Sequence, residues 1–239
     1  SDYIDWQAGT CRFDSDDYRN ILKTAKEHGV DQEFDYQNNY SADDEIMDGK
    51  VLFQAGYIDL TGIQVCDFIY EGKYNCIGHP NSERDGSYYF FPMQLGIYSK
   101  SDNKDGAWEF IRTFLTREYQ GVIMNDEGRT PTRQDCFDLM IEAAMAEKEY
   151  VNELGKDIHP RDEEYYIGNG SIRLGPLSQE QADIYVELVK RTTKAGYFDD
   201  AVTDILLEEA QGYFSGKNSL EQAVEYTQNR VSTYINEKR

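Results

Sequence analysis

The strongest structural signal in this chain is the helical periodicity of its last quarter. Apolar residues recur there with the spacing of an amphipathic helix, in three stretches separated by short breaks. Two of these stretches begin with a serine that is followed three residues later by a glutamine, which is the spacing of a capping box. The sequence therefore predicts a helical C-terminus made of three helices. Their predicted ranges are 178–194, 199–216 and 219–239, and the capping pairs are Ser178 with Gln181 and Ser219 with Gln222.

Another helix is predicted near the N-terminus. Asp14 is the expected N-cap, with Asp17 as a partial capping-box partner. Apolar residues between 18 and 25 then follow at helical spacing. Gly29 is expected to close this helix in a left-handed backbone conformation, which glycine adopts at little cost.

The middle of the chain predicts two further amphipathic helices. Residues 99–120 carry helix-capping residues and then apolar side chains on one face, and Trp108 lies beside that face, where core packing is its expected role. Residues 128–133, GRTPTR, are typical of a turn, and a second helix is predicted over 136–154. The following stretch, 155–175, is expected to be a loop.

The types of residue in the chain change between residues 50 and 97. Short segments rich in β-branched and aromatic residues are separated there by Gly, Asn and Pro, which is typical of strands. We expect them to form one small mixed β-sheet, with a helix as the alternative for some segments. Together with the flanking helices this order predicts an α/β fold, with α+β as the alternative. The segments are 51–58, 63–70, 74–80 and 87–99.

Length and charge exclude several classes of function. The 239 residues, 39% of them hydrophobic, can bury a core and suit one large domain or two small ones. We predict that residues 1–239 form a single domain. The net charge of −21 repels phosphate backbones and anionic membranes, so nucleic-acid binding is not expected. This charge fits a neutral ligand better than an anionic one. Because no apolar run of 18 residues is present, no membrane-spanning segment is predicted.

Residues that usually carry catalysis or hold metals are sparse. The four cysteines form no CxxC pair and no Cys/His cluster with zinc spacing, and disulfides are possible without being implied by the spacing. None of the hydrolase, zinc-protease, P-loop or dinucleotide-binding motifs is present, and paired carboxylates are expected by chance at this acidity. We therefore expect a binding protein that is not an enzyme and has no catalytic residue, metal site or cofactor. The cysteines are Cys11, Cys66, Cys76 and Cys136.

Tyrosine is unusually frequent, with 19 copies, and residues 88–91 are four consecutive aromatics. Tyr and Trp combine an apolar ring with a polar tip, which suits half-buried positions and sugar-binding surfaces, although a Tyr-rich surface is the simpler alternative. On a strand, four consecutive aromatics cannot all face one core, because successive side chains point to opposite faces. The run therefore raises the question of which rings are buried and which face a ligand.

Several stretches, taken in order along the chain, resemble the C-terminal part of extracellular solute-binding proteins of family 1. This is the maltose-binding-like group that serves ABC importers. The segment 95–120 is similar to the most recognisable run of that family, a strand, a serine-rich cap and an A-W-E-F helix. The turn 128–133 resembles the turn that follows it. The other stretches are 4–29, 56–65 followed by 74–80, and 208–237, the last resembling the closing helix, FSG turn and Q-x-R-V helix.

The resemblance implies a function, a location and a set of partners. It implies the C-terminal portion of a type II periplasmic-binding-protein-like fold whose N-terminal lobe is absent from this chain. Such a protein captures a sugar or oligosaccharide between two lobes and delivers it to ABC permease subunits. The implied location is extracellular, as a cell-surface lipoprotein whose anchor lies outside this chain. The alternatives are a carbohydrate-active surface module, either a glycan adhesin or a glycoside hydrolase, and an extracellular sensor domain.

The resemblance also implies candidate ligand-binding residues. Tyr57 follows Ala55-Gly56, where relatives place a sugar-stacking aromatic, and Asp59 is its polar neighbour. Tyr88 and Tyr89 precede a family strand and are expected to be available to a ligand, whereas Phe90 and Phe91 are expected in the core. The remaining candidates are Arg133, in the turn after the A-W-E-F helix, and Trp6, for which core packing is the alternative.

Overall fold

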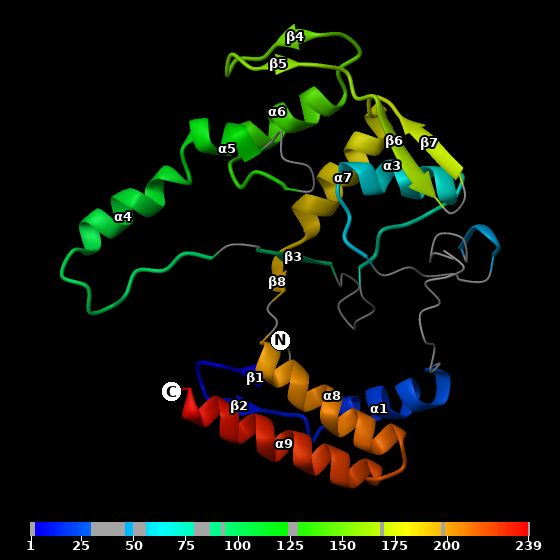
Figure 1. The fold of residues 1–239 in the computed structure, drawn as a ribbon, viewed down its shortest axis with the longest axis vertical. Helices are drawn as coiled ribbons and strands as arrows, with labels where there is room; N and C mark the ends of the chain where they lie inside the picture. The colour runs from blue at the N-terminus through cyan, green and yellow to red at the C-terminus, as the bar shows by residue number, and fades with distance from the viewer. Residues whose placement is uncertain are drawn as a thin grey trace. The chain divides into compact units, whose positions relative to one another are not determined.

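Figure 1 shows a computed structural model of the chain, which divides into two compact units. The terminal unit consists of Ser1–Phe34 and Ala195–Arg239, and the central unit of Asp35–Lys194. We describe each unit by itself, and the single domain expected for residues 1–239 stays a prediction. The structure describes residues 3–29, 46–49, 56–78, 87–91, 94–123, 129–167, 170–196 and 199–238.

Within the described residues, the terminal unit consists of three helices and a two-stranded antiparallel ribbon. Strands β1 and β2 pair with Ile4 opposite Cys11. Helices α8 and α9 lie side by side, and both α1 and β2 contact α9 (Figure 1). The elements are β1 (Ile4–Asp5), β2 (Thr10–Cys11), α1 (Asp16–His28), α8 (Asp200–Phe214) and α9 (Leu220–Glu237).

The core of the terminal unit is organised by α9. Four residues at intervals of four, from Ala223 to Ile235, have no exposed surface, so one face of the helix is completely covered. Hydrogen bonds attach the N-terminal residues 11–13 to α9. The Gln228 amide accepts from the backbone N–H of Phe13 at 2.7 Å and donates to the Cys11 carbonyl at 3.1 Å. The buried residues are Ala223, Thr227, Val231 and Ile235.

Both predicted capping boxes are confirmed, and the one at α9 supports a prediction. The Ser219 hydroxyl accepts from the Gln222 N–H at 3.3 Å, while the Gln222 side chain accepts from the Ser219 N–H at 2.9 Å. Ser219→Ala removes the acceptor for an otherwise unpaired helical N–H, so we expect a loss of about 1 kcal/mol of stability. Urea unfolding followed by circular dichroism measures it. Ser232→Ala, inside α9, is the control and should change stability little. Equal midpoints for both variants would contradict a stabilising cap.

The first helix differs from its prediction at both ends. Its N-cap is Ser15 rather than Asp14, and the Ser15 hydroxyl accepts from the Tyr18 N–H at 3.3 Å. Gly29 ends the helix with φ −65° and ψ 138°, which is an extended conformation and not the left-handed one. The Gly29 N–H still donates to the Ala25 carbonyl at 2.8 Å, so the last turn is closed without a left-handed residue.

The central unit is built from helices and short antiparallel ribbons. Helix α3 contacts α7, and the ribbon β6–β7 is the longest pairing described, with Tyr165 opposite Ile172. A second ribbon pairs β4 with β5. The elements are α3 (Leu60–Ile69), β3 (Tyr88–Phe90), α4 (Lys104–Thr113), α5 (Arg117–Ile123), α6 (Gln134–Ala144), β4 (Tyr150–Val151), β5 (Asp157–Ile158), β6 (Glu163–Ile167), β7 (Gly170–Leu174) and α7 (Gln179–Arg191), with β8 (Lys194–Gly196) at the boundary between the units.

The mixed α/β class and the helical C-terminus are confirmed, but the predicted sheet is wrong in its details. Residues 63–69 of the predicted strand 63–70 lie in helix α3, and the described strands form two-stranded pairs instead of one small mixed sheet. A short apolar run has no period that separates a buried helix from a strand. The expected loop 155–175 contains the β6–β7 ribbon, and the helix expected over 136–154 ends at Ala144. The predicted strand residues 51–55, 79–80 and 92–93 lie outside the described part of the chain.

Helix α4 forms where the sequence predicts it. Contrary to expectation, no other described element covers its apolar face. No residue of α4 is buried, and Trp108 and Phe110 are 48% and 62% exposed. The expectation that Trp108 packs in the core is therefore wrong. Helical periodicity identifies which side chains share a face, but whether another element covers that face depends on the tertiary structure.

Candidate functional site

The candidate site lies where α3 begins in the central unit. Asp59 is the N-cap of α3, and its carboxylate accepts from the Gly62 N–H at 2.7 Å. Its backbone carbonyl accepts from the Ile63 N–H at 3.1 Å, the first turn of the helix. Asp59 was expected to be a polar ligand contact; the structure gives its carboxylate a capping role at the edge of the site.

Tyr57 lies two residues before this cap and has the most exposed ring among the large hydrophobic residues described. Its exposed fraction is 88%. A single exposed ring is common on protein surfaces, so exposure alone does not define a site. A ligand-binding surface also needs polar groups held in fixed orientations, and such side chains lie around the start of α3.

Arg161 connects the ribbon β6–β7 to the start of α3. Its guanidinium donates to the Thr61 hydroxyl at 2.7 Å and to both carboxylate oxygens of Glu163 at 3.2 Å. The Arg161 side chain is only 14% exposed, whereas Glu163 is 39% exposed. A mostly buried guanidinium therefore holds a carboxylate at the surface in a fixed orientation. We call Tyr57, Asp59, Thr61, Arg161 and Glu163 the α3-start site.

Helix α7 contacts both α3 and the segment 129–133. The hydroxyl of Tyr185, a buried residue of α7, shares a hydrogen bond of 2.7 Å with the Thr130 hydroxyl. Burial raises the pKa of Tyr185, and the nearby charge of Asp59 raises it further. The Asp59 carboxylate thus lies within electrostatic range of Tyr185, and the turn adjoins the α3-start site.

Arg133 is engaged elsewhere. Its guanidinium donates to the two carboxylate oxygens of Asp135 at 3.0 and 2.9 Å, and to the Leu115 carbonyl at 3.3 Å. The hydrogen bonds from Arg133 lower the pKa of the Asp135 carboxyl. This side chain joins the end of the α4 region to the start of α6, so the structure shows a structural role for Arg133.

The aromatic run 88–91 is exposed throughout. Tyr88 and Tyr89 are 38% and 40% exposed, and Phe90 and Phe91 are 49% and 41% exposed. The expectation that the two phenylalanines lie in the core is wrong. The Tyr89 and Phe91 rings pack edge to face with centroids 5.0 Å apart, as residues two apart on an extended chain can.

Trp6 belongs to the terminal unit, where it packs against the core and lines a hollow. Its ring is half-buried and packs edge to face against Tyr234 of α9, with centroids 6.5 Å apart. Core packing, the alternative considered for Trp6, is therefore confirmed. Trp6 also lines a hollow of about 490 Å³ beside the β1–β2 ribbon. The other lining residues are Tyr3, Ile4, Asp5, Thr10, Cys11 and Arg12.

The sequence identified only part of the α3-start site. Tyr57 and Asp59 follow from the family resemblance, whereas Arg161 lies 100 positions from its partner Thr61 and carried no local signal. Its segment was expected to be a loop. Within the described residues, no group of three His, Cys, Asp or Glu side chains could hold a metal ion. The helices of the described part of the chain include none with the length and hydropathy of a membrane span.

No protein family model matches the chain, and none of the curated proteins is detectably similar to it.

Proposed function

We propose that this chain is the C-terminal portion of the substrate-binding component of a carbohydrate ABC importer. In this proposal it has a type II periplasmic-binding-protein-like fold and is located outside the cell. It captures a sugar or oligosaccharide together with an N-terminal lobe and delivers it to permease subunits. The observation that carries the proposal is the α3-start site, where the exposed ring of Tyr57 lies close in sequence to a helix start surrounded by fixed hydrogen-bonding groups.

The chemistry of this site suits a sugar. Sugars have apolar C–H faces that stack on aromatic rings, and hydroxyls that require oriented donors and acceptors. The Tyr57 ring is accessible for stacking, and the half-exposed Glu163 carboxylate can accept from hydroxyls. Because Arg161 already orients Glu163, little side-chain entropy is lost when a ligand binds. The net charge of −21 also favours a neutral ligand over an anionic one.

The order of similar segments is the second support for the proposal. The stretches that resemble family 1 occur at both ends and in the middle of the chain, in the order expected for that family. Helices α1, α4 and α9 form within three of these segments, 4–29, 95–120 and 208–237. Tyr88 and Tyr89 are two further exposed rings, and we propose them as additional contacts for an extended oligosaccharide.

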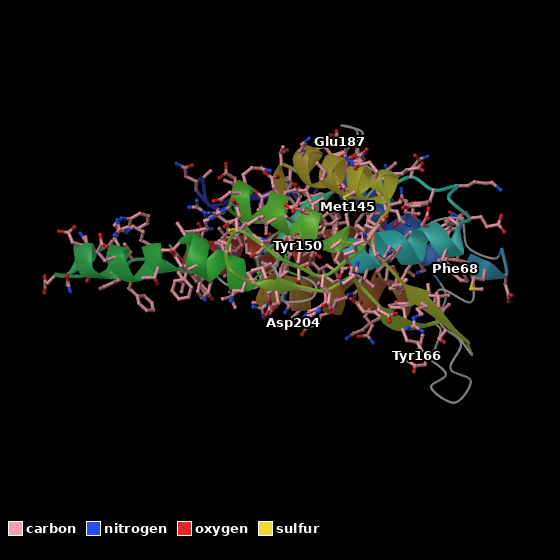
Figure 2. The ribbon with its side chains drawn as sticks, turned by 90° about the horizontal axis from the view of Figure 1, so that it is seen from above. Phe68, Met145, Tyr150, Tyr166, Glu187 and Asp204 are labelled. Carbon is pink, nitrogen blue, oxygen red and sulfur yellow. The ribbon has the colours of Figure 1, made fainter. Side chains whose placement is uncertain are left out.

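Ligand screening with the full chain tests this proposal. Thermal shift and isothermal titration calorimetry against neutral α- and β-linked oligosaccharides are expected to show one class that binds. Tyr57→Ala should then weaken binding at least about tenfold, because it removes the stacking platform. The control is Tyr166→Ala, since Tyr166 is a 74% exposed tyrosine on β6, labelled in Figure 2. This variant should bind with unchanged affinity.

Two results would contradict the proposal. If no oligosaccharide shifts the Tm while peptides or other solutes do, the ligand class is wrong. If a sugar binds but Tyr57→Ala and Tyr166→Ala leave its affinity equally unchanged, the sugar binds elsewhere and the α3-start site is not the binding surface.

A further inference from the structure

Helix α4 has an apolar face that no described element covers. The apolar residues of α4 recur at intervals of three and four, which places them on one side of the helix. No residue of α4 is buried, and neither Figure 1 nor Figure 2 shows another described element of the central unit beside it. An amphipathic helix normally buries such a face, so we expect a partner for it. The residues of the face are Ala107, Phe110, Ile111 and Phe114, with Trp108 at its edge.

The apolar surface continues into α5 through rings that touch one another. The Phe110 and Phe114 rings meet edge to face with centroids 5.3 Å apart, and the Phe114 and Tyr119 rings do so at 4.9 Å. Leu115 and Val122 add further apolar surface and are 46% and 58% exposed. An exposed apolar patch of connected rings is typical of a protein–protein interaction site. We define the α4–α5 face as Trp108, Phe110, Phe114, Leu115, Tyr119 and Val122.

The α4–α5 face is large enough to be the centre of an interface. A buried aromatic side chain contributes about 150–250 Å² of surface. Because the side chains of this face are roughly half exposed, the six together offer roughly 400–600 Å². A standard interface buries about 800 Å² on each partner, and the polar residues around the face can supply the remainder. The face therefore suits a dimer of moderate affinity.

The charges around this face favour a second copy of the same chain. Residues 104–123 carry three basic and three acidic residues and so have no net charge, whereas the whole chain carries −21. Two copies therefore repel each other little when they meet through this segment. The acidic residues of α4, Asp105 and Glu109, lie on the side opposite the apolar face, where Glu109 pairs with Arg112 at 2.7 Å.

The order of charges along the segment is self-complementary about Ile111. Lys104 and Glu118, both exposed, each lie seven positions from Ile111, and Asp105 and Arg117 each lie six positions from it. A two-fold axis near Ile111 therefore places Lys104 of one copy opposite Glu118 of the other, and Asp105 opposite Arg117. The same antiparallel arrangement sets the positive end of each helix dipole beside the negative end of the other helix.

We propose that two copies of this chain associate through the α4–α5 face as a symmetric dimer with antiparallel α4 helices. The rings of each copy cover those of the other, and a Lys104–Glu118 pair forms at either end of the interface. Burial of the rings supplies the affinity, and the order of charges selects the antiparallel arrangement. The inference does not rest on the proposed function, because it concerns contacts between copies of the chain and not a sugar.

Sedimentation velocity of the full chain, at concentrations up to about 100 µM, tests this inference. We expect a species with twice the 27.6 kDa mass of the chain and a dissociation constant on the order of micromolar. Phe110→Asp should remain monomeric, because dimerisation would bury an unpaired charge. Phe110 is 62% exposed, so the fold should tolerate the change. The matched control is Leu207→Asp, at a 64% exposed position of α8 in the terminal unit, which should dimerise like the unmodified chain.

Charge reversal tests the antiparallel arrangement. Lys104→Glu and Glu118→Lys should each weaken the dimer roughly tenfold, because each replaces attraction by repulsion at both ends of the interface. The double variant should restore the original affinity. A chain that stays monomeric at about 100 µM, or association that survives Phe110→Asp, would overturn the inference and leave the face to a different partner. A dimer that both single reversals leave unchanged would exclude the antiparallel arrangement. Sugar titrations of the Phe110→Asp protein test the proposed function separately.

Discussion

Replacing Ile235 by alanine is expected to destabilise the terminal unit by about 2–5 kcal/mol. Ile235 has no exposed surface and lies near the end of α9, on the face that forms the core. The substitution removes apolar contacts and leaves a cavity, because a packed core relaxes only partly around a missing side chain. Ile235→Val, which removes a single methylene group, should cost only about 0.5–1.5 kcal/mol.

Urea unfolding monitored by circular dichroism measures this effect. Leu207→Ala is the matched control, because Leu207 is an aliphatic residue of α8 that is 64% exposed. Its substitution should change the stability by less than about 0.5 kcal/mol. If Ile235→Ala and Leu207→Ala were equally mild, the α8–α9 packing described for the terminal unit would be wrong.

Gln120→Leu is expected to lower the stability of the central unit by about 2–4 kcal/mol. Gln120 is only 4% exposed, and its side chain links two segments. Its amide donates to the Phe114 carbonyl at 2.8 Å, while its oxygen accepts from the Thr132 N–H at 2.7 Å and the Thr132 hydroxyl at 3.2 Å. Leucine has a similar volume but leaves these backbone groups without partners, and an unpaired buried polar group is costly.

The matched control is Gln134→Leu, at the exposed start of α6. Gln134 bonds only the Asp138 carboxylate among the contacts described, at 2.7 Å, so its loss should change stability by less than about 0.5 kcal/mol. The midpoints of urea unfolding compare the stabilities of the two variants. A Gln120→Leu protein as stable as Gln134→Leu would show that the segment 129–133 does not need this buried amide.

Helices were predicted best where the signal is local. The capping boxes at Ser178 and Ser219 are confirmed because a capping box requires only residues three positions apart. The N-cap of α1 was missed by one residue, since Asp14 and Ser15 are both good caps and the sequence does not rank them. The segment 63–70 was assigned to a strand because a short apolar run fits both periods, and its packing against α7 decides for the helix.

The α3-start site shows where sequence-based prediction ends. Tyr57 and Asp59 were identified because they lie in a segment that resembles a family, but the capping role of Asp59 was not anticipated. Arg161 was missed, because its contact with Thr61 joins residues 100 positions apart. A sequence pattern does not show which residues of two distant segments lie opposite each other. The tertiary structure alone therefore reveals this contact.

The amino-acid sequence by itself determined the mixed α/β class and the helical C-terminus, because periodicity and caps are properties of neighbouring residues. The tertiary structure decided which faces are covered. It left Phe90, Phe91 and Trp108 exposed, and it brought Arg161 to α3. Burial and long-range hydrogen bonds depend on which segments pack together, and that packing is set by the whole fold rather than by any one stretch.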